Sequence, residues 1–196
     1  MTLRQQWTIV ASVVAVLGIG LAIGSHYMRA DLFPVEAGSD APDFRAKVLG
    51  SNRYRTLADY KGQVVVLNIW ATWCGPCIKE IPSLEKLYQE YGPKGLKLVA
   101  VSIDSKPGTP YVSEDSIRRF VDHFGVTFDV LHDSTEVVET AYQATGYPET
   151  FIIGREGTIR RKWIGADDWT SQGNRALIAQ LLGIETPKAI ASSGDR

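Results

Sequence analysis

Both cysteines of the chain lie in one short motif, Cys74-Gly75-Pro76-Cys77. An apolar, β-branched run that ends at Trp70 precedes the motif and predicts a strand, and apolar residues with helical spacing follow it. A Cys-x-x-Cys at such a junction places the first sulfur at a helix N-terminus, where unpaired N–H groups and the helix dipole stabilise a thiolate. The second sulfur lies about one turn further on, within reach of a disulfide bond. The motif therefore predicts a dithiol–disulfide exchange site.

Three other uses of this cysteine pair compete with exchange chemistry. Half of a zinc site would need two more ligands, and only His26, His123 and His132 remain, without a shared ligand spacing. A purely structural disulfide between such close cysteines would add little stability, because the gain grows with the length of the closed loop. A copper site built from Cys74, Cys77 and His132 is the third alternative.

The composition does not favour nucleic-acid binding. The 196 residues include 21 basic and 22 acidic side chains, which gives a net charge of −1. No basic stretch is interleaved with aromatic residues, as stacking on bases would require. A hydrophobic content of 44% supports a sizeable core, so this length predicts one domain with an appendage.

The appendage is an N-terminal segment that could cross a membrane. Residues 8–24 contain no charge, and Trp7 and Tyr27 flank them as interfacial aromatics do. Arg4 marks the short leading end as cytoplasmic. A cleaved signal peptide is the alternative, because residues 22–24 resemble a small-residue cleavage site. Both interpretations put the rest of the chain outside the cytoplasm.

Four parts follow from this pattern. Residues 1–27 are predicted as a membrane anchor or signal segment, 28–40 as a tether, 41–186 as one domain and 187–196 as a disordered tail. Within the domain, a hairpin is followed by elements in the order βαβαβαββα. The alternation predicts an α/β fold whose sheet is mainly parallel and ends in an antiparallel pair. The predicted strands lie at 64–70, 97–104 and 128–132, and hairpins are predicted over 44–49 with 54–57 and over 149–154 with 158–165. The predicted helices are one that follows Cys77, over 78–91, and three more at 114–124, 135–144 and 175–182.

The residues around the motif resemble a known family. The run over 68–82, Asn-Ile-Trp-Ala-Thr-Trp-Cys-Gly-Pro-Cys-Ile-Lys-Glu-Ile-Pro, and the later Gly-Tyr-Pro at 146–148 resemble the thioredoxin superfamily. The longer pattern, with Gly-Ala-Asp-Asp-Trp at 165–169, is similar to the membrane-anchored TlpA/ResA-like thiol–disulfide oxidoreductases. This resemblance covers about residues 41–183. It implies a thioredoxin-like fold with a mixed central sheet flanked by helices, an N-terminal β-hairpin and a single N-terminal transmembrane helix.

The resemblance assigns roles to the two thiols and to one acid. Cys74 is expected to be the attacking, more exposed thiol, and Cys77 the buried resolving thiol with which it forms a disulfide. Glu80 matches a glutamate near the two sulfurs, where a carboxylate would raise a thiol pKa or take its proton. The alternative for Glu80 is an exposed charge on the helix surface. Asn68 stands where cytoplasmic thioredoxins carry a buried aspartate, which leaves Glu80 as the candidate replacement.

The resemblance also predicts a surface that binds substrate. Its expected residues are Trp73, Gly75, Pro76, Tyr147 and Pro148. Pro148 matches the cis-proline that lies opposite the disulfide and lets a substrate pair as an added strand; the alternative is an ordinary loop proline. Trp73 is expected to be a partly exposed platform. Tyr147 is expected to face the substrate, with loop packing as its alternative.

The dipeptide between the cysteines predicts the direction of the reaction. Gly75-Pro76 is the pair found in reducing thioredoxins, whereas strong oxidants of the superfamily carry a histidine there. We therefore expect a protein-disulfide reductase. We expect it to need no cofactor or metal, to be monomeric and to be attached to the periplasmic side of the cytoplasmic membrane. The resemblance implies a membrane thiol reductase as electron donor and oxidised apocytochrome c or a copper-site assembly protein as client.

Two alternative functions stay open. One is a general extracytoplasmic oxidant or disulfide isomerase. Another is a copper-binding chaperone that uses the two thiols as Cu(I) ligands. A peroxidase of the related peroxiredoxin type is disfavoured, because its cysteine would stand in a Thr-x-x-Cys setting that this motif does not match.

Overall fold

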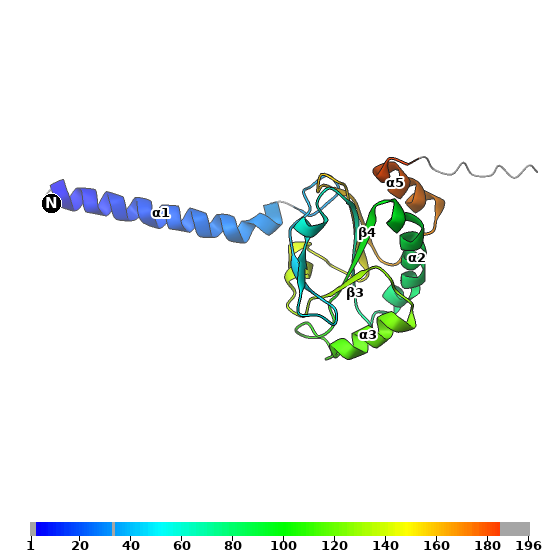
Figure 1. Ribbon diagram of the computed structural model, residues 1–196. Helices are drawn as coiled ribbons and strands as arrows, with labels where there is room; N and C mark the ends of the chain where they lie inside the picture. The colour runs from blue at the N-terminus through cyan, green and yellow to red at the C-terminus, as the bar shows by residue number, and fades with distance from the viewer. Residues whose placement is uncertain (1–2, 33, 185–196) are drawn as a thin grey trace, which may run out of the picture. The chain divides into compact units, whose positions relative to one another are not determined.

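The computed structural model describes residues 3–32 and 34–184. The chain divides into two compact units, Met1–Pro34 and Val35–Arg196. The first consists of one long helix, α1 (Leu3–Leu32), and the second contains a sheet with its covering helices (Figure 1). The tail predicted over 187–196 lies outside the described residues.

The second unit is built on one mixed sheet of seven strands in the order β2-β1-β5-β4-β3-β6-β7. In the part of the chain that the structure describes, only β3 with β4 and β4 with β5 pair in parallel. The other pairings are antiparallel, so the prediction of a mainly parallel sheet is wrong; the first two and the last two strands join it as antiparallel pairs. The strands are β1 (Arg45–Val48), β2 (Tyr54–Thr56), β3 (Val64–Trp70), β4 (Leu96–Ser102), β5 (Asp129–His132), β6 (Glu149–Ile153) and β7 (Ile159–Ile164).

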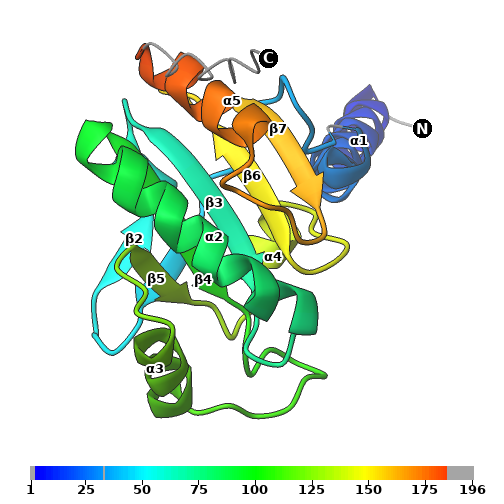
Figure 2. The same cartoon turned by 90° about the vertical axis from the view of Figure 1, so that its right-hand side faces the viewer.

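Helices cover both faces of this sheet, as the resemblance implied. Figures 1 and 2 show α2, α3 and α5 on one face, while the short α4 lies on the other. Ser113 caps α3 by accepting a hydrogen bond from the Ser116 N–H, and Ser171 caps α5 in the same way. The helices are α2 (Gly75–Tyr91), α3 (Glu114–His123), α4 (Val137–Ala141) and α5 (Gln172–Leu182), with 3-10 turns at Leu57–Tyr60 and Gly92–Lys94.

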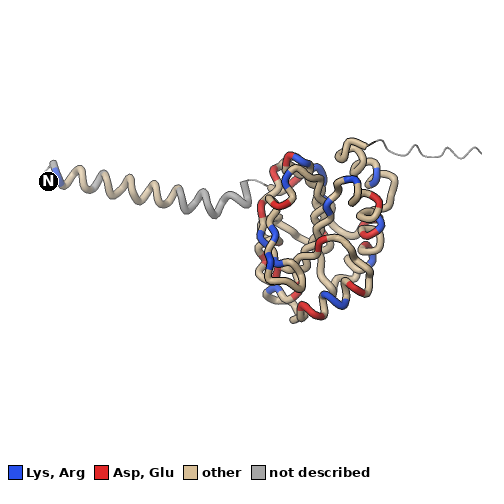
Figure 3. The backbone as a smooth tube through the Cα atoms, viewed as in Figure 1, with Lys and Arg blue, Asp and Glu red and all other residues tan. Residues whose placement is uncertain are grey.

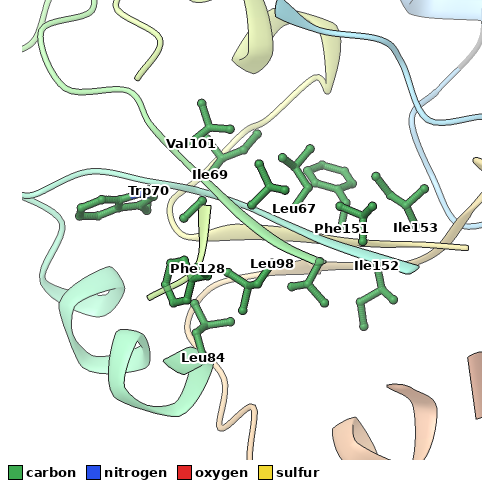
Figure 4. Close-up of a cluster of buried hydrophobic side chains, with 14 of the residues drawn as sticks. Leu67, Ile69, Trp70, Leu84, Leu98, Val101, Phe128, Phe151, Ile152 and Ile153 are labelled. Atoms are coloured by element: carbon green, nitrogen blue, oxygen red, sulfur yellow. The ribbon is translucent and has the colours of Figure 1, made fainter. Parts of the chain in front are cut away.

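The core lies on both sides of the central strands (Figure 4). Because side chains alternate along a strand, Leu98 and Ile152 face the same side as Leu84 of α2. Phe151 faces the opposite side, where its ring centroid lies 4.9 Å from that of Tyr142 just after α4. The strands β3, β4 and β6 are thus buried on both faces, which makes them a rigid support for the residues at their ends.

The segment before the sheet differs from the predicted tether over 28–40. Helix α1 continues to Leu32, and Val35 is buried in the second unit. The Gly38 N–H donates to the carbonyl of Ile159 at 2.8 Å, and Asp40 forms a β-bridge with Thr158. Residues 35–40 therefore belong to the domain, because they cover backbone groups at the start of the edge strand β7.

One described helix is long and apolar enough to cross a membrane. The apolar stretch is Arg4–Leu21 within α1. A signal sequence near an N-terminus would have the same length and apolar character. Figure 3 shows Lys, Arg, Asp and Glu interspersed over the second unit, while the described side chains after Arg4 in α1 carry none of these charges. The two units thus differ sharply in surface chemistry.

Candidate active site

The strand–turn–helix that carries the cysteines begins where β3 ends. The carbonyl of Trp70, the last residue of β3, accepts a hydrogen bond from the Ile103 N–H at 2.9 Å. The chain then turns, and the Cys74 N–H donates to the carbonyl of Ala71 at 3.2 Å. Cys74 is the N-cap of α2, and its sulfur accepts a hydrogen bond from the Cys77 N–H at 3.2 Å. The first sulfur therefore lies among the free N–H groups of a helix start.

The two cysteines form a disulfide, with their Cα atoms 5.2 Å apart. Cys77 is fully buried and Cys74 is 6% exposed, so Cys74 is the more accessible sulfur, as predicted. Gly75 and Pro76 are exposed beside it. An incoming thiol or disulfide can therefore meet Cys74, whereas Cys77 can react only with a sulfur already held there.

Glu80 lies one turn beyond Cys77 and is only 2% exposed, so the alternative of an exposed surface charge is wrong. One carboxylate oxygen accepts a hydrogen bond from the Asn68 side-chain amide at 2.7 Å. The other accepts from the Trp169 indole N–H at 3.1 Å and from the Asp167 backbone N–H at 3.4 Å. Asn68 thus contacts Glu80 directly, on the face of β3 that α2 covers.

Burial raises the pKa of Glu80 from its ordinary value to about 7. Desolvation of the charged form is the largest cause, and the hydrogen bonds from Trp169, Asn68 and Asp167 oppose it by favouring the carboxylate. A carboxyl group that titrates near neutral pH can both take and return a proton in that range. Such a perturbed acid beside a reactive pair is typical of catalytic sites.

Glu80 also borders a cleft between α2 and the loop that joins β7 to α5. Its volume is about 470 Å³. Charged and hydroxyl side chains of both segments surround it, so water can approach Glu80 from this side. The described lining residues are Lys79, Glu80, Pro82, Ser83, Lys86, Ala166, Asp167, Asp168 and Thr170.

The predicted substrate side gathers around Trp73, which is 43% exposed. Its ring lies edge-on to that of Tyr147, with centroids 6.0 Å apart. The Tyr147–Pro148 bond is cis, as predicted, and the Pro148 carbonyl accepts a hydrogen bond from the Gly165 N–H at 2.8 Å. The Tyr147 hydroxyl accepts from the Lys106 ammonium at 3.0 Å. The structure therefore brings the motif and the proline loop together through the two aromatic rings.

Sequence reasoning missed Trp169 as a partner of Glu80. Trp169 is 1% exposed and follows β7, and its backbone N–H donates to the Ser83 hydroxyl at 3.2 Å. Thr150 of β6 was missed as well; its hydroxyl accepts a second hydrogen bond from the Asn68 amide at 2.9 Å. The sequence marks Trp169 only as part of a family pattern, and its polar N–H next to a buried acid could not be foreseen from spacing.

His132 is turned toward other partners than a metal. One ring nitrogen lies 2.8 Å from the carbonyl of Asp104, and the other lies 3.5 Å from the carboxylate of Glu114. Within residues 3–32 and 34–184, no three His, Cys, Asp or Glu side chains gather as a metal site would require. Both ring nitrogens of His132 thus face groups other than the two sulfurs, and the Cys74–Cys77 disulfide is the reactive feature of the site.

Comparisons with known proteins agree with this chemistry. Residues 37–162 match the AhpC/TSA family. The chain is 34% identical over 148 residues to the thiol-disulfide oxidoreductase ResA of Geobacillus kaustophilus strain HTA426, covering 76% of this chain and 80% of that protein. It is 39% identical over 131 residues to the thioredoxin-like protein YneN of Bacillus subtilis strain 168, covering 67% of this chain and 73% of the relative.

Solved structures show the same fold. A Chlorobium tepidum protein assigned to the DsbE class of thiol:disulfide interchange proteins superposes with a TM-score of 0.65 at 29% identity. The match covers 76% of this chain and 99% of that one. The thioredoxin domain of a thiol-disulfide oxidoreductase from Bacteroides vulgatus has a TM-score of 0.62 at 23% identity, over 74% of this chain and 97% of its own, which supports the fold alone.

Proposed function

This chain belongs to the AhpC/TSA family and, within it, to the ResA-like thiol-disulfide oxidoreductases, and we propose that it reduces disulfides of client proteins outside the cytoplasm. The observation that carries the proposal is the Cys74–Cys77 disulfide at the start of α2, with the buried acid Glu80 one turn further on. Such a pair needs no cofactor, because the electrons are stored in the two sulfurs.

The first step uses the accessible sulfur. In the reduced protein, the Cys74 thiolate at the helix N-terminus attacks one sulfur of the client disulfide. The other client sulfur leaves as a thiolate and takes a proton from water. The client is then held to Cys74 by a mixed disulfide, against the surface formed by Trp73, Gly75, Pro76, Tyr147 and Pro148.

The second step needs a base at the buried sulfur. Glu80 takes the proton of the Cys77 thiol, and the resulting thiolate attacks the sulfur of Cys74. The mixed disulfide breaks, and the second client sulfur leaves as a thiolate and takes up the proton that Glu80 removed from Cys77. The client has gained two electrons and two protons, while the Cys74–Cys77 disulfide has formed.

The direction and the setting complete the proposal. The uncharged Gly75-Pro76 pair supplies no positive charge to stabilise the Cys74 thiolate, which favours a reductant over an oxidant. Helix α1 would anchor the domain on the periplasmic side of the cytoplasmic membrane, where a membrane thiol reductase would return the enzyme to its dithiol form. Monomeric enzyme would act on oxidised apocytochrome c or on a copper-site assembly protein.

The direction is tested by the reduction potential of the cysteine pair. We expect a value near about −270 mV in graded glutathione or dithiothreitol buffers, as for thioredoxin. A value near about −120 mV would show that the protein donates disulfides, and would overturn the direction.

Trapping variants test the order of the two thiols and identify the client. Cys77→Ser should accumulate mixed disulfides with oxidised peptides that carry Cys-x-x-Cys-His or a copper-site thiol pair, whereas Cys74→Ser should form none. Preferential trapping of one peptide class identifies the client. Trapping through Cys77 instead of Cys74 would reverse the assigned roles.

A further inference from the structure

Asp104 is a fully buried acid that the exchange mechanism does not use. It follows β4, and its carboxylate accepts hydrogen bonds from the Thr72 hydroxyl at 2.7 Å and from the Thr72 backbone N–H at 3.0 Å. The Ser102 hydroxyl donates to it as well, at 2.7 Å. In each of these hydrogen bonds the carboxylate is the acceptor, so the acid is held by three donor groups.

The group held by Asp104 is the turn that leads to the reactive sulfur. Thr72 lies two residues before Cys74, inside the turn closed by the hydrogen bond from the Cys74 N–H to the Ala71 carbonyl. Trp70 and Ser102 are register partners on the parallel strands β3 and β4, so both strands end at the same edge of the sheet. Asp104, which follows the neighbouring strand β4, therefore holds this turn through its hydrogen bonds to Thr72.

Asp104 is itself fixed from the other side. Its backbone N–H donates to the Ser102 hydroxyl at 3.2 Å, and its carbonyl lies 2.8 Å from a ring nitrogen of His132. The other ring nitrogen of His132 lies near Glu114, which forms an ion pair with Lys47 at 2.7 Å. The carboxylate thus has little freedom to turn away from Thr72.

We propose that Asp104 is a positioning residue for the redox pair: it fixes the turn before Cys74 and places a buried negative charge beside that turn, two residues from the reactive sulfur. This charge opposes formation of the Cys74 thiolate. Because a less stable thiolate favours the disulfide, Asp104 holds the couple on the reducing side. The inference rests on the exchange activity proposed above.

The test is Asp104→Asn in the full-length protein, with Asp104→Ser as a second variant that also removes the charge and leaves room for water. We expect the equilibrium with glutathione to shift at least threefold toward the dithiol, and the pKa of the Cys74 thiol to fall. A tenfold shift would correspond to about 30 mV. Thiolate absorbance against pH reports the pKa independently of activity.

Asp133 offers a matched control. It is a buried aspartate whose carboxylate accepts hydrogen bonds from the backbone and hydroxyl of Thr135 and from the Val138 N–H, none of which belongs to the turn before Cys74. Asp133→Asn should lower thermal stability but leave the potential and the thiol pKa unchanged. If the Asp104 variants also leave the potential and the thiol pKa unchanged, this inference is overturned and the proposed function is not affected. Wild-type protein that fails to exchange with glutathione would instead overturn the proposed function.

Discussion

The side chain of Glu80 is buried among neutral hydrogen-bond donors. Its described partners are the amide of Asn68, the indole of Trp169 and the backbone N–H of Asp167. These donors favour the carboxylate, but none brings the positive charge that would compensate fully for its burial. The acid is therefore held close to the balance between its two protonation states at neutral pH, which a proton acceptor requires.

We predict that Glu80→Gln slows resolution of the mixed disulfide by about 10²-fold, as expected for loss of a general base. In the wild type, this rate should rise as the pH climbs through about 7, because only ionised Glu80 can accept the proton of Cys77. The variant should lose that rise. Rapid-quench measurement of client release from pH 5.5 to 8.5 gives both results.

Glu85→Gln is the control for this experiment. Glu85 lies on the same helix, and its carboxylate accepts hydrogen bonds from Gln89 and Thr127 at the protein surface. Its replacement should leave the pH profile unchanged. A Glu80→Gln profile that still rises through pH 7 would remove Glu80 from the proton transfer.

The raised pKa of Glu80 also predicts how stability depends on pH. Between its ordinary pKa of 4.5 and the folded value of about 7, the folded protein binds a proton that the unfolded chain has released. The free energy of unfolding should therefore fall as the pH rises through this window, by up to about 3 kcal/mol. Urea unfolding of the oxidised wild type and of Glu80→Gln measures the difference. The same dependence of the free energy of unfolding on pH in both proteins would contradict the prediction.

At the scale of elements, the loop between β7 and α5 completes the environment of this acid. It supplies the indole and backbone donors to Glu80, and Ser83 on α2 holds it through the Trp169 N–H. The loop and the helix together form the walls of the polar cleft beside Glu80. Proton transfer thus depends on a contact between two elements far apart in the sequence.

We predict that Trp169→Phe raises the pKa of Glu80 further, because the variant loses an indole N–H whose hydrogen bond favours the carboxylate. The pH profile of mixed-disulfide resolution should move to higher pH, with a loss of stability of about 1 kcal/mol. Trp163→Phe, at a partly exposed ring of β7 beside Arg161, serves as the control. A profile that stays in place in Trp169→Phe would show that the indole has no part in setting this pKa.

Local patterns predicted the elements better than the contacts between them. The strand before Cys74 and the helix after Cys77 follow from the spacing of apolar residues, and the predicted 149–154 and 158–165 pair is present as β6 and β7. The antiparallel pairing of β1 with β5 and of β6 with β3 was missed, because the alternation of elements alone does not state which strands become neighbours.

The missed contacts of the site have the same cause. The Trp169–Glu80 hydrogen bond joins residues 89 positions apart, and Thr72–Asp104 joins residues 32 apart. No helical or strand period relates such positions. Glu80 itself was predicted from the family pattern, but its burial follows from the packing of Asn68 and Trp169 around it and could not be read from its own sequence neighbours.

At the scale of the whole molecule, the chain combines an apolar helix with a domain that has its own core. The apolar stretch Arg4–Leu21 contains only one charged residue, at its first position. The unit from Val35 onward buries a continuous set of side chains from both faces of the sheet and includes the complete redox site. The core and the redox site thus lie within one unit, so we expect folding and exchange chemistry to be independent of α1, whereas location would depend on it.

We predict that a chain starting at Val35 has nearly the same cysteine reduction potential as the full-length protein. The equilibrium constants of the two proteins with glutathione should differ by less than twofold. Full-length protein should sediment with membranes and resist extraction by carbonate, because a helix of this apolar length is stable in a bilayer. The shortened chain should stay in the supernatant. If expression of the full sequence instead yields a shortened protein in the supernatant, residues 1–27 are a cleaved signal segment.

The side of the membrane follows from a second measurement on the same cells. Protease added to spheroplasts should digest the domain of the full-length protein while a cytoplasmic marker survives, if Arg4 keeps the short leading end inside. Protection of the domain would place the cysteines in the cytoplasm. There the thiol pool already keeps cysteines reduced, and the proposed role of reducing client disulfides from an anchored position would have to be given up.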